Sequence, residues 1–364
     1  MSLAFALGLL MALPALHAQE AAMFRGGPEH RGVAPVSRAP HLTTVKWKVR
    51  LGPRVLSSPV AAEGLIFVGS ADHHLYALEP ATGATRWRYA TEGEVNSSPA
   101  VADGLVVVGS RDGRVHAVDA RGGKGVWTFR TGGERRFTAP GIHGALPATE
   151  LMPDPFDVFL SSPAVDRGTV YIGSGDQHVY ALDLKTGALR WKFKTGDVVH
   201  ASPAVAGGTV YVGSWDRRFY ALDAVTGAPR WSFLTGDDPD LHNQIGIASS
   251  AAVEGGRVFF GCRDGHFYAL DAATGSLLWK HDNHKGWVIA SPAVTRDTVY
   301  FPTSDGRRFK ALDAATGALR FDRENPAISF SSPTLAGGRL YFGSSDGWLH
   351  ALEAATGREL EAFQ

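Results

Sequence analysis

The chain has 364 residues, and its 36 lysine and arginine residues balance its 36 aspartate and glutamate residues, so the formal net charge is zero. This balance disfavours DNA, RNA or another polyanion as the partner, because polyanions are bound by an excess of positive charge. The single cysteine, Cys262, leaves the chain without an internal disulfide, a CxxC metal motif or a CxxCH haem attachment motif.

The first 18 residues are almost wholly apolar, and polar sequence begins at Gln19. A short apolar run at the N-terminus, broken by Pro14 and ending in Ala18, predicts a signal peptide over residues 1–18. An uncleaved membrane anchor is the alternative. No cysteine follows the run to carry a lipid, and no later segment has the apolar length of a membrane span. We therefore expect a mature protein without a transmembrane span, periplasmic or secreted.

Seven copies of a repeat follow an N-terminal extension over residues 19–44. Each copy reads S-P-A-V, a short gap, V-Y-V-G-S-x-D, and then Y-A-L-D-x-x-T-G-x-x-x-W, and the clearest copy lies at residues 202–231. One aspartate marks each copy, at intervals of 40, 64, 40, 48, 41 and 41 residues: Asp72, Asp112, Asp176, Asp216, Asp264, Asp305 and Asp346. Self-similarity at this period indicates an array of supersecondary units that bury their faces against one another.

Each repeat holds four expected strands, which in the clearest copy are residues 201–205, 209–213, 218–223 and 229–234. Valine, tyrosine, phenylalanine and tryptophan dominate these strands, and glycine-containing pairs supply the turns between them. A four-stranded unit with three tight reversals favours a β-propeller over a β-solenoid. We expect an all-β fold over residues 45–364, a β-propeller of four-stranded antiparallel blades. Seven blades are expected, and eight are the alternative.

Residues 45–51, VKWKVRL, match the fourth strand of the repeat but precede the first copy. The last copy has Glu361 where most other copies have tryptophan. An N-terminal strand that completes or reinforces the last blade would close the ring and cover an open edge. We expect residues 45–51 to take this place.

One long insertion, over residues 131–160, produces the 64-residue interval. It opens on the same end of the ring as the loop entering each first strand and the hairpin joining the second and third strands. That end carries bulky and ionisable side chains that turns do not need, and rigidly held loops commonly bind ligands. The candidates for binding a ligand or partner are Arg135, Arg136, His143, His200, Trp215, Arg217, His242, Asn243, Arg263, His284 and Trp287. The alternative is that the insertion plugs the channel and the histidines form hydrogen bonds to loop backbone.

Three histidines, His200, His242 and His284, precede first strands at near-blade spacing. They lack a local pair of ligands, so we expect no metal site. Cys262 is expected to be a small buried residue rather than a nucleophile. No catalytic motif or pair of catalytic carboxylates stands out, and no catalytic residue is expected.

The signature A-x-D-x-x-T-G-x-x-x-W at residues 181–191, 221–231 and 269–279 resembles the repeat of the PQQ-like β-propeller superfamily. The motif MFRGGP at residues 23–28 with Gly32 and Val33 is similar to the lead-in of such propellers. The resemblance implies that the tryptophan of each repeat docks onto the adjacent blade, with Phe321 as one replacement. These structural residues are Trp87, Trp127, Trp191, Trp231 and Trp279.

The superfamily includes quinoprotein dehydrogenases and a non-enzymatic assembly factor of the outer-membrane β-barrel assembly machinery. The dehydrogenases resemble one another in a vicinal cysteine pair beside the cofactor and a Ca²⁺ held by acidic and amide groups, whereas this chain has one cysteine. The resemblance thus implies a non-catalytic scaffold without a cofactor, which binds a protein or peptide partner in the cell envelope. The alternatives are an enzyme dependent on PQQ and Ca²⁺, and a small-ligand sensor.

Overall fold

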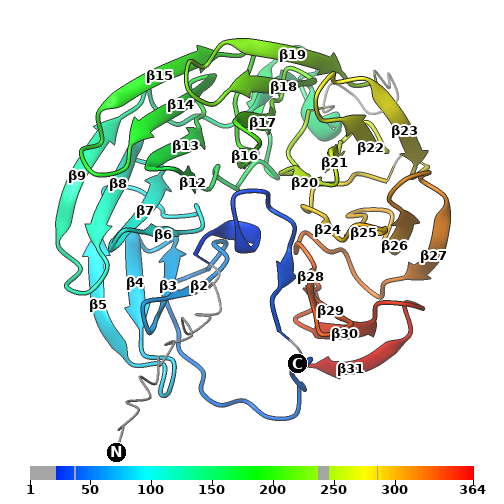
Figure 1. Ribbon diagram of the computed structural model, residues 1–364, viewed down its shortest axis with the longest axis horizontal. Helices are drawn as coiled ribbons and strands as arrows, with labels where there is room; N and C mark the ends of the chain where they lie inside the picture. The colour runs from blue at the N-terminus through cyan, green and yellow to red at the C-terminus, as the bar shows by residue number, and fades with distance from the viewer. Residues whose placement is uncertain (1–21, 37, 237–245, 285) are drawn as a thin grey trace, which may run out of the picture.

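The computed structural model describes residues 22–36, 38–236, 246–284 and 286–364. Within them the chain forms 3-10 helices η1 (Phe24–Gly26) and η2 (Ile142–Gly144) and otherwise only strands. Seven sheets stand radially around a central axis, and a further two-stranded sheet lies in the insertion (Figure 1). The expected all-β propeller of antiparallel four-stranded blades is confirmed, and each radial sheet corresponds to one copy of the repeat.

The strands of each blade follow one another from the axis outwards in chain order. Blade 1 contains β2 (Val60–Ala62), β3 (Leu65–Ser70), β4 (His74–Leu78) and β5 (Thr85–Ala90). Blade 2 contains β6 (Ala100–Ala102), β7 (Leu105–Ser110), β8 (Arg114–Asp119) and β9 (Gly125–Arg130). Blade 3 contains β12 (Ala164–Asp166), β13 (Thr169–Gly173), β14 (His178–Asp183) and β15 (Leu189–Lys194). Blade 4 contains β16 (Ala204–Ala206), β17 (Thr209–Gly213), β18 (Arg218–Asp223) and β19 (Pro229–Leu234).

The remaining blades repeat this plan. Blade 5 contains β20 (Ala252–Glu254), β21 (Arg257–Gly261), β22 (His266–Asp271) and β23 (Leu277–Asp282). Blade 6 contains β24 (Ala293–Val294), β25 (Thr298–Pro302), β26 (Arg308–Asp313) and β27 (Leu319–Glu324). Blade 7 contains β28 (Thr334–Ala336), β29 (Arg339–Gly343), β30 (Leu349–Glu353) and β31 (Glu359–Phe363), and its inner edge pairs in parallel with β1 (Val33–Ala34). The insertion contributes the hairpin β10 (Thr138–Pro140) and β11 (Leu151–Pro153).

The burial of each strand follows its place in the blade. All five residues of β17 are buried, because neighbouring blades cover both faces of the middle strands. Along the outermost strand β19, half-buried residues alternate with exposed ones. The bounds of β17, β18 and β19 match the sequence prediction, while β16 begins three residues later than predicted.

Tryptophans of the outer strands connect adjacent blades. The indole Nε1 of Trp191 in blade 3 donates to the backbone carbonyl of Ala224 in blade 4, at 3.0 Å. Gly227 lies flat against the same indole with φ +73°, where a Cβ would come within 2.6 Å of the ring. Four other indoles donate to carbonyls in the next blade in the same way: Trp87 to Ala120, Trp127 to Leu184, Trp231 to Ala272 and Trp279 to Ala314. Phe321 packs against Gly357 at the corresponding place, without an N–H donor.

In each blade, one serine faces the axis and takes part in a hydrogen bond to the adjacent blade. The backbone N–H of Ser162, for example, donates to the Oγ of Ser202 at 2.9 Å. The ladder runs through seven serines: Ser58, Ser98, Ser162, Ser202, Ser250, Ser291 and Ser332. In the part of the chain that the structure describes, no such bond joins Ser332 back to Ser58. The ring is therefore open between blade 7 and blade 1, at the foot of the view in Figure 1.

The N-terminal residues 22–34 lie at the centre of the ring beside the innermost strands (Figure 1). Their carbonyls accept backbone hydrogen bonds from blades 2, 4, 5, 6 and 7 in turn. The donors and acceptors are Val101 to Ala22, Val205 to Pro28, Val253 to Glu29, Val294 to Arg31 and Leu335 to Gly32. The lead-in motif of the sequence is thus a connector that ties five blades together. The predicted signal peptide over residues 1–18 lies outside the described residues.

The expectation that residues 45–51 complete the last blade is wrong. These residues form no strand, and Trp47 instead packs on Gly83 of blade 1 and donates its indole N–H to Pro80 O at 3.0 Å. The reason is that Trp47 takes the docking place which the tryptophan of a preceding blade takes elsewhere in the ring. The inner edge of blade 7 is covered by β1 instead.

Candidate functional site

The insertion, residues 131–160, folds across one end of the axis and contacts the entry loops and hairpins of several blades. Asn96 Nδ2 of blade 2 donates to Val158 O at 3.2 Å. On the far side, the rings of Phe156 and Phe330 lie 6.3 Å apart, and Phe330 belongs to the loop that enters blade 7. The insertion and the candidate side chains of the blades therefore lie at the same end of the ring.

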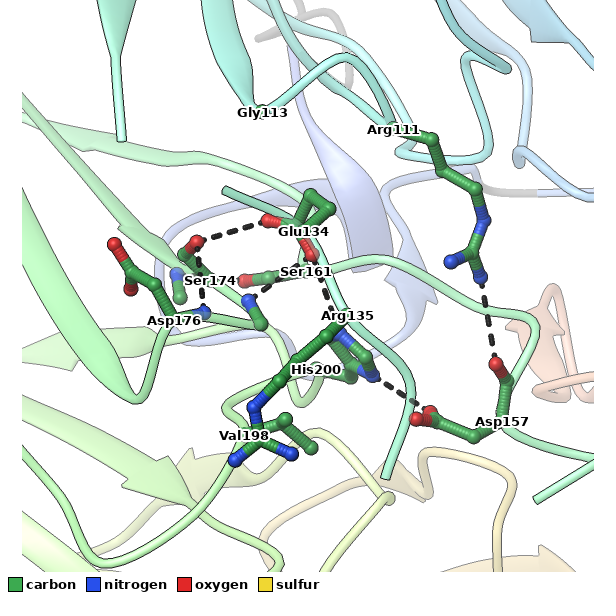
Figure 2. Close-up of polar contacts among 12 residues, drawn as sticks. Arg111, Gly113, Glu134, Arg135, Asp157, Ser161, Ser174, Asp176, Val198 and His200 are labelled. Atoms are coloured by element: carbon green, nitrogen blue, oxygen red, sulfur yellow. Dashed lines mark hydrogen bonds and ion pairs between the residues drawn. The ribbon is translucent and has the colours of Figure 1, made fainter. Parts of the chain in front are cut away.

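A buried charge cluster holds the start and the end of the insertion to blade 4 (Figure 2). Nδ1 of His200, just before β16, lies 2.6 Å from Asp157 Oδ1, and its Nε2 lies 3.3 Å from Glu134 Oε2. Glu134 also accepts hydrogen bonds from Ser174 Oγ at 2.9 Å. Arg111 of blade 2 donates to the Asp157 carbonyl. The cluster fixes both ends of the insertion to the propeller.

The electrostatics of this cluster favour a charged imidazole. Burial by itself lowers the pKa of His200, but the charges and hydrogen bonds of Asp157 and Glu134 outweigh it and raise the pKa to about 9. Burial likewise raises the pKa of Asp157, yet the charge and hydrogen bond of His200 leave it below its ordinary value. At neutral pH the pair is an ion pair, and neither ring nitrogen of His200 is left for a ligand.

A second buried ion pair joins the insertion to blade 5. Arg263, in the hairpin between β21 and β22, bonds through Nη1 to the fully buried carboxylate of Asp154. The guanidinium also lies over two indoles, 4.7 Å from the centre of the Trp215 ring and 3.9 Å from that of Trp287. His143 Nε2 lies 3.1 Å from the other carboxylate oxygen of Asp154. Cation–π contact and charge pairing together stabilise an arginine at this depth.

Aromatic packing completes the attachment. Trp215 stacks on Phe137 of the insertion with ring centres 4.5 Å apart. Together with Ile142 and Val198 these rings form a small hydrophobic core beneath the insertion. Five of the eleven predicted binding residues take part in these buried contacts between the insertion and the blades: His143, His200, Trp215, Arg263 and Trp287.

The other predicted binding residues lie as follows. Arg135 is exposed and pairs with Asp197 at 2.7 Å, and Arg136 beside it is half-buried. Arg217 lies in the hairpin between β17 and β18, where its carbonyl accepts from Thr235. The imidazole of His284 is 89% exposed. His242 and Asn243 lie outside the described residues.

Metal and thiol chemistry have little basis in these side chains. Among the described residues, no group of three or more histidine, cysteine, aspartate or glutamate side chains is arranged to hold a metal ion. Cys262 is buried, and burial raises the pKa of its thiol well above the ordinary value. A protonated, inaccessible thiol is a packing residue rather than a nucleophile.

A cavity of about 640 Å³ lies on the axis between the N-terminal Phe24 and the insertion residues Phe159 and Leu160. Serines of the axial ladder form much of its wall, and His200 is the one ionisable side chain among the described residues that line it. PQQ is a polycarboxylate, and this wall offers it no arginine or lysine. The single cysteine provides no vicinal pair, so the residues present do not fit PQQ with Ca²⁺.

Exposed apolar side chains on the insertion were not among the sequence candidates. Leu146 is 83% exposed, Leu151 is 66% exposed and Phe156 is 45% exposed. In the sequence they are apolar residues in a segment that lacks the period of the repeat. Such a pattern does not distinguish apolar side chains that are exposed from apolar side chains that fill the channel. Asp154 and Asp157 of the insertion are buried, whereas these three apolar side chains are exposed.

Comparisons with known proteins agree with this architecture. The family model described as outer membrane protein assembly factor BamB matches residues 40–148, 148–282 and 243–362. The chain therefore belongs to the BamB family, within the PQQ-like propellers. A search of curated proteins found no significant match.

Solved structures show the same fold at low identity. BamB from Moraxella catarrhalis is 20% identical, with a TM-score of 0.67 over 86% of each chain. The quinohemoprotein alcohol dehydrogenase ADHIIG from Pseudomonas putida HK5 is 17% identical, with a TM-score of 0.76 over 95% of this chain and 72% of that one. A europium-containing methanol dehydrogenase is 16% identical, with a TM-score of 0.73 over 96% and 86%. Within the described residues, no helix has the length and apolarity needed to cross a membrane.

Proposed function

We propose that this chain is a non-catalytic scaffold in the cell envelope that binds a protein partner through the exposed face of its insertion. The observation that carries the proposal is that residues 131–160 are held by buried acidic side chains and yet expose apolar ones. Buried ion pairs at Asp154 and Asp157 fix the insertion, while Leu146, Leu151 and Phe156 remain exposed. The family description, outer membrane protein assembly factor, supports a role in the assembly of outer-membrane proteins.

Rigid presentation of apolar side chains favours protein binding on energetic grounds. Association costs less when the binding surface is already ordered, and a few well-placed apolar residues supply most of the binding free energy. Two buried ion pairs and the core around Phe137 and Trp215 order the insertion before any partner arrives. The exposed leucines then remain available for a partner.

The axial cavity supports a second candidate, a quinoprotein-like enzyme or a small-ligand sensor. Its volume of about 640 Å³ is that of a small-molecule site, and the fold is shared with quinohemoprotein dehydrogenases. Its wall of serines and apolar residues argues against PQQ in particular. A neutral polar ligand suits such a wall better than a polycarboxylate does.

The test compares two substitutions, each of which replaces an exposed apolar side chain by aspartate, at opposite ends of the ring. Leu151→Asp alters the insertion, and Val225→Asp alters a side chain that is 81% exposed in the loop between β18 and β19. Binding of each variant to the purified outer-membrane protein assembly machinery is measured by surface plasmon resonance. We expect Leu151→Asp to weaken binding at least about tenfold and Val225→Asp to leave it unchanged.

The proposal is wrong if both variants bind like the parent chain or if the parent chain does not bind. Reconstitution with PQQ and Ca²⁺ provides the opposing arm of the test. Stoichiometric uptake together with dye-linked oxidation of an alcohol or sugar would replace the scaffold with an enzyme.

A further inference from the structure

Residues 45–51 form no strand, but they lie where the outermost strand of a blade preceding blade 1 would lie. Trp47 docks on Gly83 in blade 1 as the tryptophans of true blades dock on their neighbours, and Ser70 Oγ donates to Leu51 O at 2.6 Å. In every blade, however, the outermost strand is also paired with a third strand. Within the described part of the chain, residues 45–50 make no backbone hydrogen bond. Their N–H and C=O groups are available to a new strand.

The facing side of blade 7 is correspondingly uncovered. Leu349 opens β30 and is 38% exposed, whereas Phe219, at the same position of blade 4, is fully buried by the next blade. Ser58 and Pro59 in blade 1 are exposed, whereas Ser202 and Pro203 in blade 4 are buried. The opening between blades 7 and 1 therefore exposes side chains that the rest of the ring buries.

The charges of residues 45–51 favour one kind of added strand. Lys46, Lys48 and Arg50 alternate with apolar residues, and all three are exposed. The structure records no ion pair for any of them, although it describes all three. Opposite charges on directly facing residues of two strands stabilise their pairing, and like charges destabilise it.

We propose that residues 45–51 are a β-augmentation site for a partner protein, which adds a strand in which acidic residues alternate with apolar ones. Backbone hydrogen bonds to residues 45–50 supply affinity, and the three basic side chains select acidic neighbours. The apolar side chains of the added strand lie in the opening beside Leu349. This surface is distinct from the insertion, so the proposal is independent of the scaffold function.

The experiment uses the whole chain and two synthetic peptides, one alternating glutamate with valine and the other alternating lysine with valine. Fluorescence anisotropy measures binding, and hydrogen exchange measures protection of the amides of residues 45–50. We expect the glutamate peptide to bind and to protect these amides. The triple substitution Lys46→Glu, Lys48→Glu, Arg50→Glu should weaken that binding about tenfold and favour the lysine peptide instead.

Two controls separate strand pairing from attraction to any basic surface. Lys192→Glu with Lys194→Glu changes exposed lysines on β15, an outermost strand already paired in its blade, and should leave binding unchanged. Leu151→Asp, which tests the insertion, should also leave it unchanged.

Several results would overturn the proposal. Basic side chains on an edge strand also serve to repel other strands. If neither peptide binds the parent chain or the triple variant, the role of the three basic side chains is to repel other strands, and the proposed site does not exist. Binding without protection of residues 45–50 excludes strand pairing. Concentration-dependent protection without peptide would assign the opening to a second copy of this chain.

Discussion

His200 and Asp157 form a buried ion pair, with Nδ1 of the imidazole 2.6 Å from the carboxylate Oδ1. The aspartate ends the insertion and the histidine precedes β16, so this contact connects the insertion to blade 4. Because both partners are almost fully buried, their ionisation is coupled to folding. The pair therefore makes the stability of the attached insertion depend on pH.

We predict that the stability contributed by His200 is lost on the alkaline side of neutrality. Its pKa rises from an ordinary value of 6.5 to about 9 on folding, so the folded state binds the proton more tightly. The contribution is complete below pH 6.5 and disappears as the pH rises through about 9, a loss on the order of 3 kcal/mol. Thermal unfolding between pH 6 and pH 10 measures it.

The matched comparison is His200→Gln against His284→Gln, since the His284 side chain is exposed. The His200 variant should be less stable at pH 6 and should lose the alkaline decline between pH 6.5 and pH 9. The His284 variant should follow the parent curve. Parallel curves for the parent chain and His200→Gln would contradict the prediction.

A second prediction concerns the charge of Asp154. Asp154→Asn leaves the buried Arg263 guanidinium without its carboxylate, and breaking a buried pair in this way costs about 3–5 kcal/mol. Asp197→Asn removes the partner of the exposed Arg135 and should cost less than about 1 kcal/mol. Urea unfolding monitored by tryptophan fluorescence measures both. Equal effects of the two substitutions would show that the Arg263 pair is not a main anchor.

The sequence predicted the propeller because its signals are local. An Asp-Gly or Thr-Gly turn and a strand of valine and tyrosine are encoded within one repeat, and β17, β18 and β19 have the bounds predicted from such a repeat. The place where residues 45–51 dock is not encoded within one repeat. The motif identified Trp47 as an outer-strand tryptophan, but only the curvature of the whole ring decides which blade it meets.

The candidate site shows the same limit. The departures from the repeat drew attention to His200, Trp215 and Arg263, yet their residue types did not reveal whether they face a ligand or the insertion. That depends on the fold of residues 131–160, which has no periodic pattern. Asp154 pairs with Arg263 and Asp157 pairs with His200, but in the sequence both aspartates looked like ordinary loop residues.

The docking glycines give a third prediction, which separates steric clash from backbone strain. Gly227 and Gly208 have nearly equal φ, +73° and +74°, but a Cβ on Gly227 would lie 2.6 Å from the Trp191 indole, while one on Gly208 meets nothing closer than 4.0 Å. Gly208→Ala should cost about 1 kcal/mol from the positive φ alone. Gly227→Ala should cost about 1–3 kcal/mol more, because the indole is displaced.

Chemical unfolding of the two alanine variants measures this difference. Trp191→Phe serves as a further comparison, because it removes the indole N–H but keeps an aromatic ring, as Phe321 does in blade 6. The carbonyl of Ala224 would still accept from Tyr171, so the loss should be only about 1 kcal/mol. Equal losses for Gly227→Ala and Gly208→Ala would show that the contact between blades is not tight.

The last prediction tests how the chain crosses the opening in the ring. Glu361 of β31 accepts the backbone N–H of Leu42 at 2.6 Å, and it also contacts His41 and Arg339, each at 2.7 Å. The Leu42 hydrogen bond, followed by Arg339 and His41, lowers the pKa of Glu361 to about 2. Because a depressed pKa stabilises only the ionised state, this contact persists well below pH 4.5 and is lost as the pH falls through about 2.

Glu361→Ala should therefore release the segment that runs from Leu42 to the docked Trp47. Trypsin cleaves after lysine and arginine, and Lys46, Lys48 and Arg50 all lie on or beside this exposed segment. We expect cleavage there to become about fivefold faster, because local release exposes backbone to the protease without unfolding the blades. Glu353→Ala, in the last turn of the same blade, is the control and should not alter the rate. An unchanged rate in both variants would mean that Trp47 alone holds the segment against blade 1.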